Sequence, residues 1–78
     1  MFPRIKEFKL NDDYTINIVF TNDELGIFDL KPFLDKGSFK SLNDLMTFKS
    51  AKLNDGVLTW NQRLDISPDT VYMLCTKN

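Results

Sequence analysis

The chain has 78 residues, of which 42% are hydrophobic and 13% aromatic, and its formal net charge is −1. This length predicts one small domain, residues 1–78, and the apolar share is too high for a disordered chain. Histidine is absent and cysteine occurs once, which excludes a disulfide within the chain and a Cys/His zinc site. We expect no membrane span, because no apolar run approaches ~18 residues. We also expect a cytoplasmic protein without a secretory leader.

Three strands are predicted in the first part of the chain. Residues 4–10 alternate imperfectly between polar and apolar types, which indicates an edge strand or a bulge. Residues 14–20 are apolar at every second position, and residues 25–30 form a third run. Polar turns at 11–13 and 21–24 join these runs, which is the pattern of an antiparallel meander.

Short helices are predicted further along. Residues 31–34 allow one helical turn, and Ser38 is placed to cap a short amphipathic helix. Near the C-terminus Ser67 caps a helix, Pro68 occupies its first turn, and Asp69 faces its positive end. Three residues are expected on the buried side of this last helix: Val71, Leu74 and Cys75.

Two more strands complete the expected fold. Residues 48–53 and 57–60 flank Asn54-Asp55-Gly56, a strong hairpin signal, and residues 61–66 are predicted to form a polar turn. The expected fold class is therefore α+β. It consists of a five-strand, mostly antiparallel sheet, a meander plus a hairpin, with two or three short helices packed on one face.

The ordered motifs resemble a known family. They are Pro3-x-Ile5, Tyr14-x-Ile16-x-Ile18-x-Phe20, Phe28-Asp29-Leu30, Gly37-Ser38-Phe39-x-x-Leu42-x-Asp44-x-x-x-Phe48, Trp60, Asp65-Ile66-Ser67-Pro68-Asp69 and Val71-Tyr72. Together they span about residues 3–74 and resemble the small bacterial family known as domain of unknown function 2442. The resemblance implies a compact α+β domain of unassigned activity, with no established catalytic residue to carry over.

The resemblance also has implications for partners. Some relatives carry a DNA-binding helix-turn-helix after this domain, and members are often encoded beside another small protein, in arrangements that look like toxin–antitoxin pairs. Because this chain stops soon after Tyr72, we expect no such DNA-binding appendage. The family usually has glycine at the turn after the second strand, where this chain has Asp23-Glu24, a difference that affects the turn type.

Two sets of residues are candidates for chemistry or binding. Asp29 lies among aromatic and aliphatic residues and could act as an acid or base, although we favour a role in capping the turn around Pro32. Trp60, Arg63 and Asp65 could form a small polar binding pocket. The simpler interpretation, which we favour, is that Trp60 covers the core beneath the last helix while Asp65 orders the turn.

The remaining candidates are weaker. Cys75 has no histidine to activate it and lies at the end of a helix that disfavours a thiolate, so we expect an inert, packed thiol. Asp12-Asp13 and Asp23-Glu24 could bind a divalent cation if their turns share one end of the sheet. We expect solvated turns instead, because no calcium-loop spacing is present. The sequence therefore predicts no cofactor and no metal.

Three functions remain open from the sequence. We favour a non-catalytic protein–protein interaction module, in which a sheet edge or leftover aromatic residues contact an unidentified protein partner. A homodimer that pairs through one face or edge of the sheet is also expected. The alternative is a nucleic-acid-associated regulator, suggested only by the net charge of +3 in residues 31–52. The third is an enzyme acting through Asp29, Asp65 or Asp44, which we disfavour because so small a domain has little room for a cleft.

Overall fold

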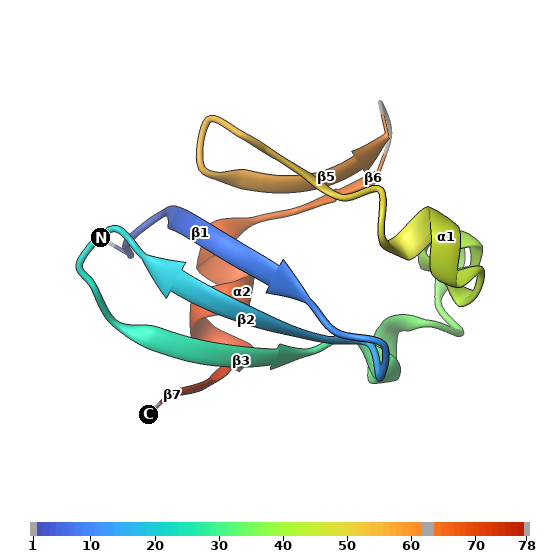
Figure 1. Ribbon diagram of the computed structural model, residues 1–78, viewed down its shortest axis with the longest axis horizontal. Coiled ribbons are helices and arrows are strands. Elements are labelled where there is room, and N and C mark those ends of the chain that lie inside the picture. The colour runs from blue at the N-terminus through green and yellow to red at the C-terminus, as the bar shows by residue number, and fades with distance from the viewer. Residues whose placement is uncertain (1, 62–63, 78) are drawn as a thin grey trace.

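The computed structural model describes residues 2–61 and 64–77 and places them in two antiparallel sheets (Figure 1). The first sheet has the strand order β1-β2-β3-β7 and the second has the order β4-β5-β6. The strands are β1 (Ile5–Leu10), β2 (Thr15–Phe20), β3 (Leu25–Asp29), β4 (Lys52–Asn54), β5 (Val57–Asn61), β6 (Leu64–Ile66) and β7 (Thr76–Lys77). The helical elements are the 3-10 helices η1 (Lys31–Phe33) and η2 (Gly37–Asn43) and the α-helices α1 (Leu45–Phe48) and α2 (Pro68–Leu74).

The prediction of one five-strand sheet is wrong. The β4–β5 hairpin does not join the meander but pairs with β6, a strand that lies in the segment predicted to be a turn. Leu64 and Ile66 are buried on either side of the exposed Asp65, so these three residues have the period-two burial of a strand. The helices are not all on one face either, since α2 lies behind the first sheet while α1 lies beyond its end (Figure 1).

The predicted meander is confirmed, with its imperfection in the predicted place. β1, β2 and β3 pair in sequence, and the β1–β2 register shifts between Ile5 and Glu7, which is the bulge that the broken alternation indicated. The hairpin signal is confirmed as well. Asp55 and Gly56 have φ angles of 54° and 79°, the two positive values that a tight hairpin turn requires.

Of the two predicted helix caps, the one near the C-terminus is confirmed. The Ser67 hydroxyl accepts a hydrogen bond from the Asp69 amide at 3.2 Å, with Pro68 in the first turn, as predicted. In the middle, a 3-10 helix replaces the expected α-helix, and Asp44 caps α1 by accepting from the Met46 amide, whereas the side chain of Ser38 lies outside what the structure describes. Residue 48, predicted to begin a strand, is the last residue of α1.

The core lies between the first sheet, α2 and the second sheet. Its fully buried members include Phe20, Phe28 and Phe48, and Trp60 is 6% exposed. The other buried apolar residues are Ile5, Ile16, Ile18, Leu30, Leu42, Leu58, Leu64, Ile66, Val71 and Cys75. Leu74, predicted to lie on the buried side of α2, is instead 58% exposed.

The two sheets meet where β1 begins. The Ile5 amide donates to the Gly56 carbonyl, and the Arg4 guanidinium donates to the Asp55 carbonyl at 2.9 Å, so the tip of the β4–β5 hairpin lies beside the start of β1. A glycine at position 56 is required for a second reason, since an added Cβ would lie 2.8 Å from the Arg4 Cβ. The hairpin tip therefore covers part of the free edge of β1.

Candidate functional site

Two of the three residues of the predicted pocket, Trp60 and Asp65, lie in different environments. The indole of Trp60 is buried, stacks on Phe48 with ring centroids 6.5 Å apart, and donates its N–H to the Phe48 carbonyl at 2.9 Å. Asp65 is exposed in the middle of β6, paired with Thr59. Arg63 lies outside the described residues. The structure thus gives Trp60 a place in the core, and a binding role for the three residues remains a prediction.

Asp29 and Cys75 have structural contacts. The Asp29 carboxylate accepts a hydrogen bond from the Lys31 amide at 3.0 Å, and its oxygen lies 3.7 Å from the Lys31 ammonium. These contacts order the turn before Pro32, as the simpler interpretation held. The Cys75 side chain is buried against Gly26, and its thiol donates weakly to the Tyr72 carbonyl. The contacts of both side chains are those of residues that hold the fold together.

The two acidic turns lie at opposite ends of the first sheet, so the premise of a shared cation site is wrong. A strand connects them: Asp13 precedes β2 and Asp23 follows it, and the turns therefore face opposite ways (Figure 1). Among residues 2–61 and 64–77, no three acidic or cysteine side chains are grouped as a metal site would need. Asp44, the third acidic candidate, caps α1 and also accepts from the Thr47 hydroxyl at 3.0 Å.

Two side chains have shifted pKa values, each with a local cause. Hydrogen bonds from the Thr15 hydroxyl and amide lower the pKa of Asp13. Donation of the Tyr72 hydroxyl to the Glu24 carboxylate raises the pKa of Tyr72, because the proton is held between the two oxygens. Both shifts are explained by turn and packing contacts, so they do not indicate an acid or base poised for catalysis.

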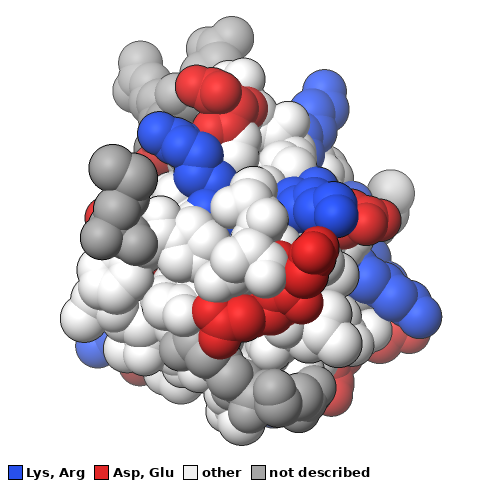
Figure 2. Space-filling view, turned by 90° about the vertical axis from the view of Figure 1, so that its left-hand side faces the viewer, with Lys and Arg blue, Asp and Glu red and all other residues white. Residues whose placement is uncertain are grey.

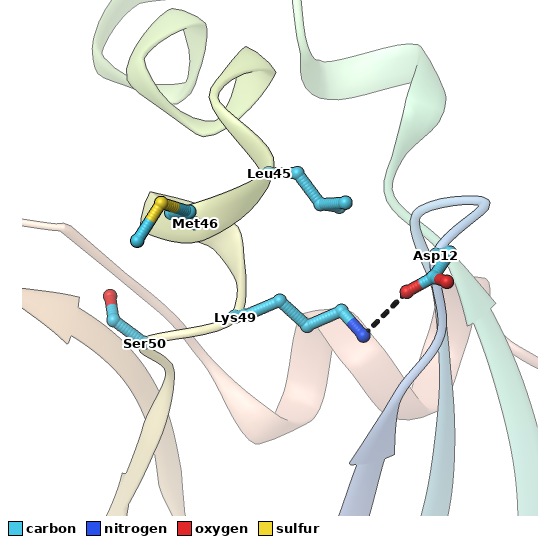
Figure 3. A pocket seen from close by; sticks show the side chains of 5 residues that line it. All are labelled: Asp12, Leu45, Met46, Lys49 and Ser50. Carbon is cyan, nitrogen blue, oxygen red and sulfur yellow. Dashed lines mark ion pairs between the residues drawn. The ribbon is translucent and has the colours of Figure 1, made fainter.

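A shallow hollow lies between α1 and the β1–β2 turn. It has a volume of ≈ 360 Å³ and is lined by Leu45, Met46, Lys49, Ser50 and Asp12. Figure 3 shows Lys49 extending toward Asp12, and their charged atoms are 2.6 Å apart. Leu45 extends in the same direction in this view, whereas Met46 points away. The hollow combines an apolar wall with one ion pair and has a single carboxylate.

Two further hollows adjoin the N-terminal segment and share Phe2 and Arg4. One is completed by Pro3, Thr21 and Asn22, and the other by Ser67, Pro68 and Asp69. The Phe2 ring contacts Tyr72 at a centroid distance of 5.5 Å. None of these three hollows has a wall with two carboxylates among the described residues, so none has the paired acid and base of a glycoside hydrolase.

The sequence reasoning did not identify the residues on the open face of the first sheet. Figure 1 looks onto this face, with α2 behind the strands. Residues paired across antiparallel strands share a face, so the register defines three rows on the open side, and the row nearest the β1–β2 turn is Thr15 and Asp29. The first row is Glu7, Val19 and Leu25, and the second is Lys9, Asn17, Ile27 and Thr76.

Of the three β3 residues on this face, Leu25 and Ile27 are apolar and Asp29 is charged. Leu25 is 50% exposed and Ile27 is 38% exposed, and Val19, the partner of Leu25, is partly buried. The other side of β3 carries the buried Gly26 and Phe28, so residues 25–28 are apolar on both sides of the strand. A continuous apolar run is typical of a strand that is covered on both faces. The signal was present in the sequence as Leu25-Gly26-Ile27-Phe28.

On the face shown in Figure 2, charges of both signs occur together. The end of the molecule that carries the N-terminus has acidic and basic side chains interspersed (Figure 2). Within the basic segment 31–52, Lys31 pairs with Asp29 and Lys49 pairs with Asp12. The +3 charge of that segment is therefore partly offset by acidic residues from the first sheet and its turn.

The architecture and this surface define a small α+β domain with two sheets and one open, partly apolar sheet face. The model of a family described as "Protein of unknown function (DUF2442)" matches residues 5–77, and the chain belongs to that family, as its motifs indicated. Searches of curated proteins and of solved structures gave no match. Within the described part of the chain, each helix is too short or too polar to cross a membrane.

Proposed function

We propose that this domain is a non-catalytic protein–protein interaction module and that the open face of the first sheet is its contact surface. The observation that carries the proposal is the placement of Leu25 and Ile27 on the uncovered side of β3. An antiparallel sheet with one solvated face normally presents polar side chains there. Two aliphatic residues beside Val19 depart from that pattern, and burying them against a partner would stabilise a complex.

Contact through a sheet edge has less support. β7 has two residues, and β1 carries a bulge, two lysines and the hairpin tip at its start, all of which hinder the addition of a further strand. The predicted contact through leftover aromatic residues also has little support. Phe2, 42% exposed, is the one aromatic ring among the large exposed hydrophobic residues described, and the others are Leu25, Ile27, Leu45, Met46, Met73 and Leu74.

A matched pair of variants tests the proposal. Ile27→Lys places a charge on the open face, and Met46→Lys places the same charge on α1, where the native side chain is 83% exposed. The tagged proteins are purified from the source organism under mild conditions and examined by mass spectrometry and sedimentation. We expect the wild type and Met46→Lys to co-purify with a stoichiometric binding partner, which is either another protein or a second copy of the chain. Ile27→Lys should lack this partner. A monomer without a companion would refute the proposal, as would association that Ile27→Lys does not affect.

Two narrower alternatives have their own tests. The family resemblance favours an antitoxin-like partner of a neighbouring small protein, which co-expression of the two gene products would test. The nucleic-acid alternative depends on the lysines of segment 31–52, two of which are held in ion pairs. It predicts salt-dependent binding of duplex DNA or RNA below ~100 mM salt. A titration with no binding signal would refute the nucleic-acid alternative.

A further inference from the structure

The geometry points to a second copy of this chain as the occupant of the open face, in a dimer formed by face-to-face packing of two β1-β2-β3-β7 sheets. This inference rests on the proposed function and specifies its partner. It starts from two of the three rows defined above: Glu7, Val19 and Leu25 in one, and Lys9, Asn17, Ile27 and Thr76 in the other. Each row is charged at β1 and apolar at β3.

The charges of the two rows are opposite in sign. Glu7 and Lys9 are both exposed, and neither forms an ion pair with another described residue. Across β1 and β2 the face is therefore neutral overall but carries one charge of each sign at equivalent places in adjacent rows. A strongly acidic or basic partner would match one row and be repelled by the other.

A two-fold axis that runs across the strands, between the two rows, makes both rows complementary at β1 and at β3, while Val19 lies over Asn17 at β2. The rotation leaves each strand over its own counterpart and exchanges the rows. Glu7 then lies over Lys9 of the other copy, and Lys9 over Glu7. At β3, Leu25 lies over Ile27 of the other copy. Such an isologous interface needs self-complementary residues, and packed sheets keep their strands within about 30° of each other.

The size of the open face determines the expected affinity of the dimer. Three short strands and β7 correspond to the low end of interface sizes, ~600 Å² per partner. The isolated chain exposes 5008 Å². An interface of this size, with an apolar centre of three side chains per copy, should give a dimer with a Kd of about 1–100 µM. The dimer should therefore dissociate on dilution.

Charge reversal tests this arrangement. Glu7→Lys places two lysines over each other on both sides of the axis, and Lys9→Glu does the same with two carboxylates. We expect each variant alone to dimerise about tenfold more weakly in sedimentation equilibrium between about 1 and 500 µM. An equimolar mixture of the two variants should associate as tightly as the wild type, because both pairs across the axis are then opposite in sign. The double variant should also recover wild-type affinity.

Controls separate this inference from the proposed function. Because both residues are exposed and form no ion pair within the described chain, the thermal midpoint of each variant should match that of the wild type at concentrations where all are monomeric. Met46→Lys should dimerise normally, and Ile27→Lys should not dimerise at all. A wild type that is monomeric at the highest concentration, or a mixture that fails to associate, would overturn the two-fold arrangement. If such a monomer still captured a different protein and lost it on Ile27→Lys, the proposed function would stand and this inference would fall.

Discussion

Gly26→Ala is the most informative test of the packing between β3 and α2. A Cβ added to Gly26 would lie 2.8 Å from the Cys75 sulfur and 3.4 Å from Phe20 Cε2. Alanine is the better residue in a strand by ~0.5–1 kcal/mol, but overpacking a core costs about 1–3 kcal/mol. The clash should win because 2.8 Å is well inside normal carbon–sulfur contact. We expect a net loss of about 1–2 kcal/mol, or ~4–16 °C in Tm.

Cys75→Ala provides the control, since it removes the sulfur and leaves the Cys75 Cβ at an ordinary 3.5 Å from the added methyl carbon. Alone it should cost about 1 kcal/mol, the value for a buried group of this size. When Gly26→Ala is added to the Cys75→Ala variant, the free energy of unfolding should stay unchanged or increase. The four proteins are compared by urea unfolding, which yields the interaction free energy directly. If Gly26→Ala cost the same with and without the sulfur, the steric explanation would be refuted.

Three further predictions concern single side chains. Trp60→Phe removes the hydrogen bond to the Phe48 carbonyl and should lower the free energy of unfolding by about 1–3 kcal/mol in urea titrations, with an unchanged value contradicting the role of that bond. Asp44→Ala removes the cap of α1 and should cost about 0.5–2 kcal/mol, with amide exchange accelerating first in this helix. Tyr72→Phe tests the raised pKa of Tyr72. The hydrogen bond to Glu24 stabilises the fold below about pH 10 and is lost as the pH rises through the pKa of Tyr72 in the folded state. In thermal scans above that pH, the wild type should therefore lose more stability than the variant.

The features that the sequence predicted well are those that depend on near neighbours. The hairpin turn at Asp55-Gly56 follows from the ability of these two residues to adopt positive φ angles. The start of α2 follows from a hydroxyl at Ser67 that accepts the Asp69 amide. The meander follows from alternation in β2 and short turns. In each case the interaction that selects the structure lies within a few residues, so the local pattern contains the information.

The features that it missed depend on contacts between distant segments. The sequence predicts a turn at the position of β6, because three residues cannot establish a period, and the strand forms through its pairing with β5. β7 has two residues and exists through its pairing with Gly26 and Ile27, which lie far earlier in the chain. Leu74 has the right spacing for the buried side of α2, but the helix ends against a short strand and leaves it exposed.

At the open sheet face, the local sequence pattern and the long-range structure must be combined to find the candidate site. β2 alternates cleanly, and its exposed positions are largely polar, so nothing about β2 demands a second covering layer. β3 runs beside it with Leu25 and Ile27 on the open side and Phe28 on the core side, so its pattern is that of a strand with two covered faces. Within the described chain α2 covers one of these faces. This mismatch between the strand pattern and the single covered face supports the proposed partner, and it becomes visible only when the sequence pattern and the layer structure are considered together.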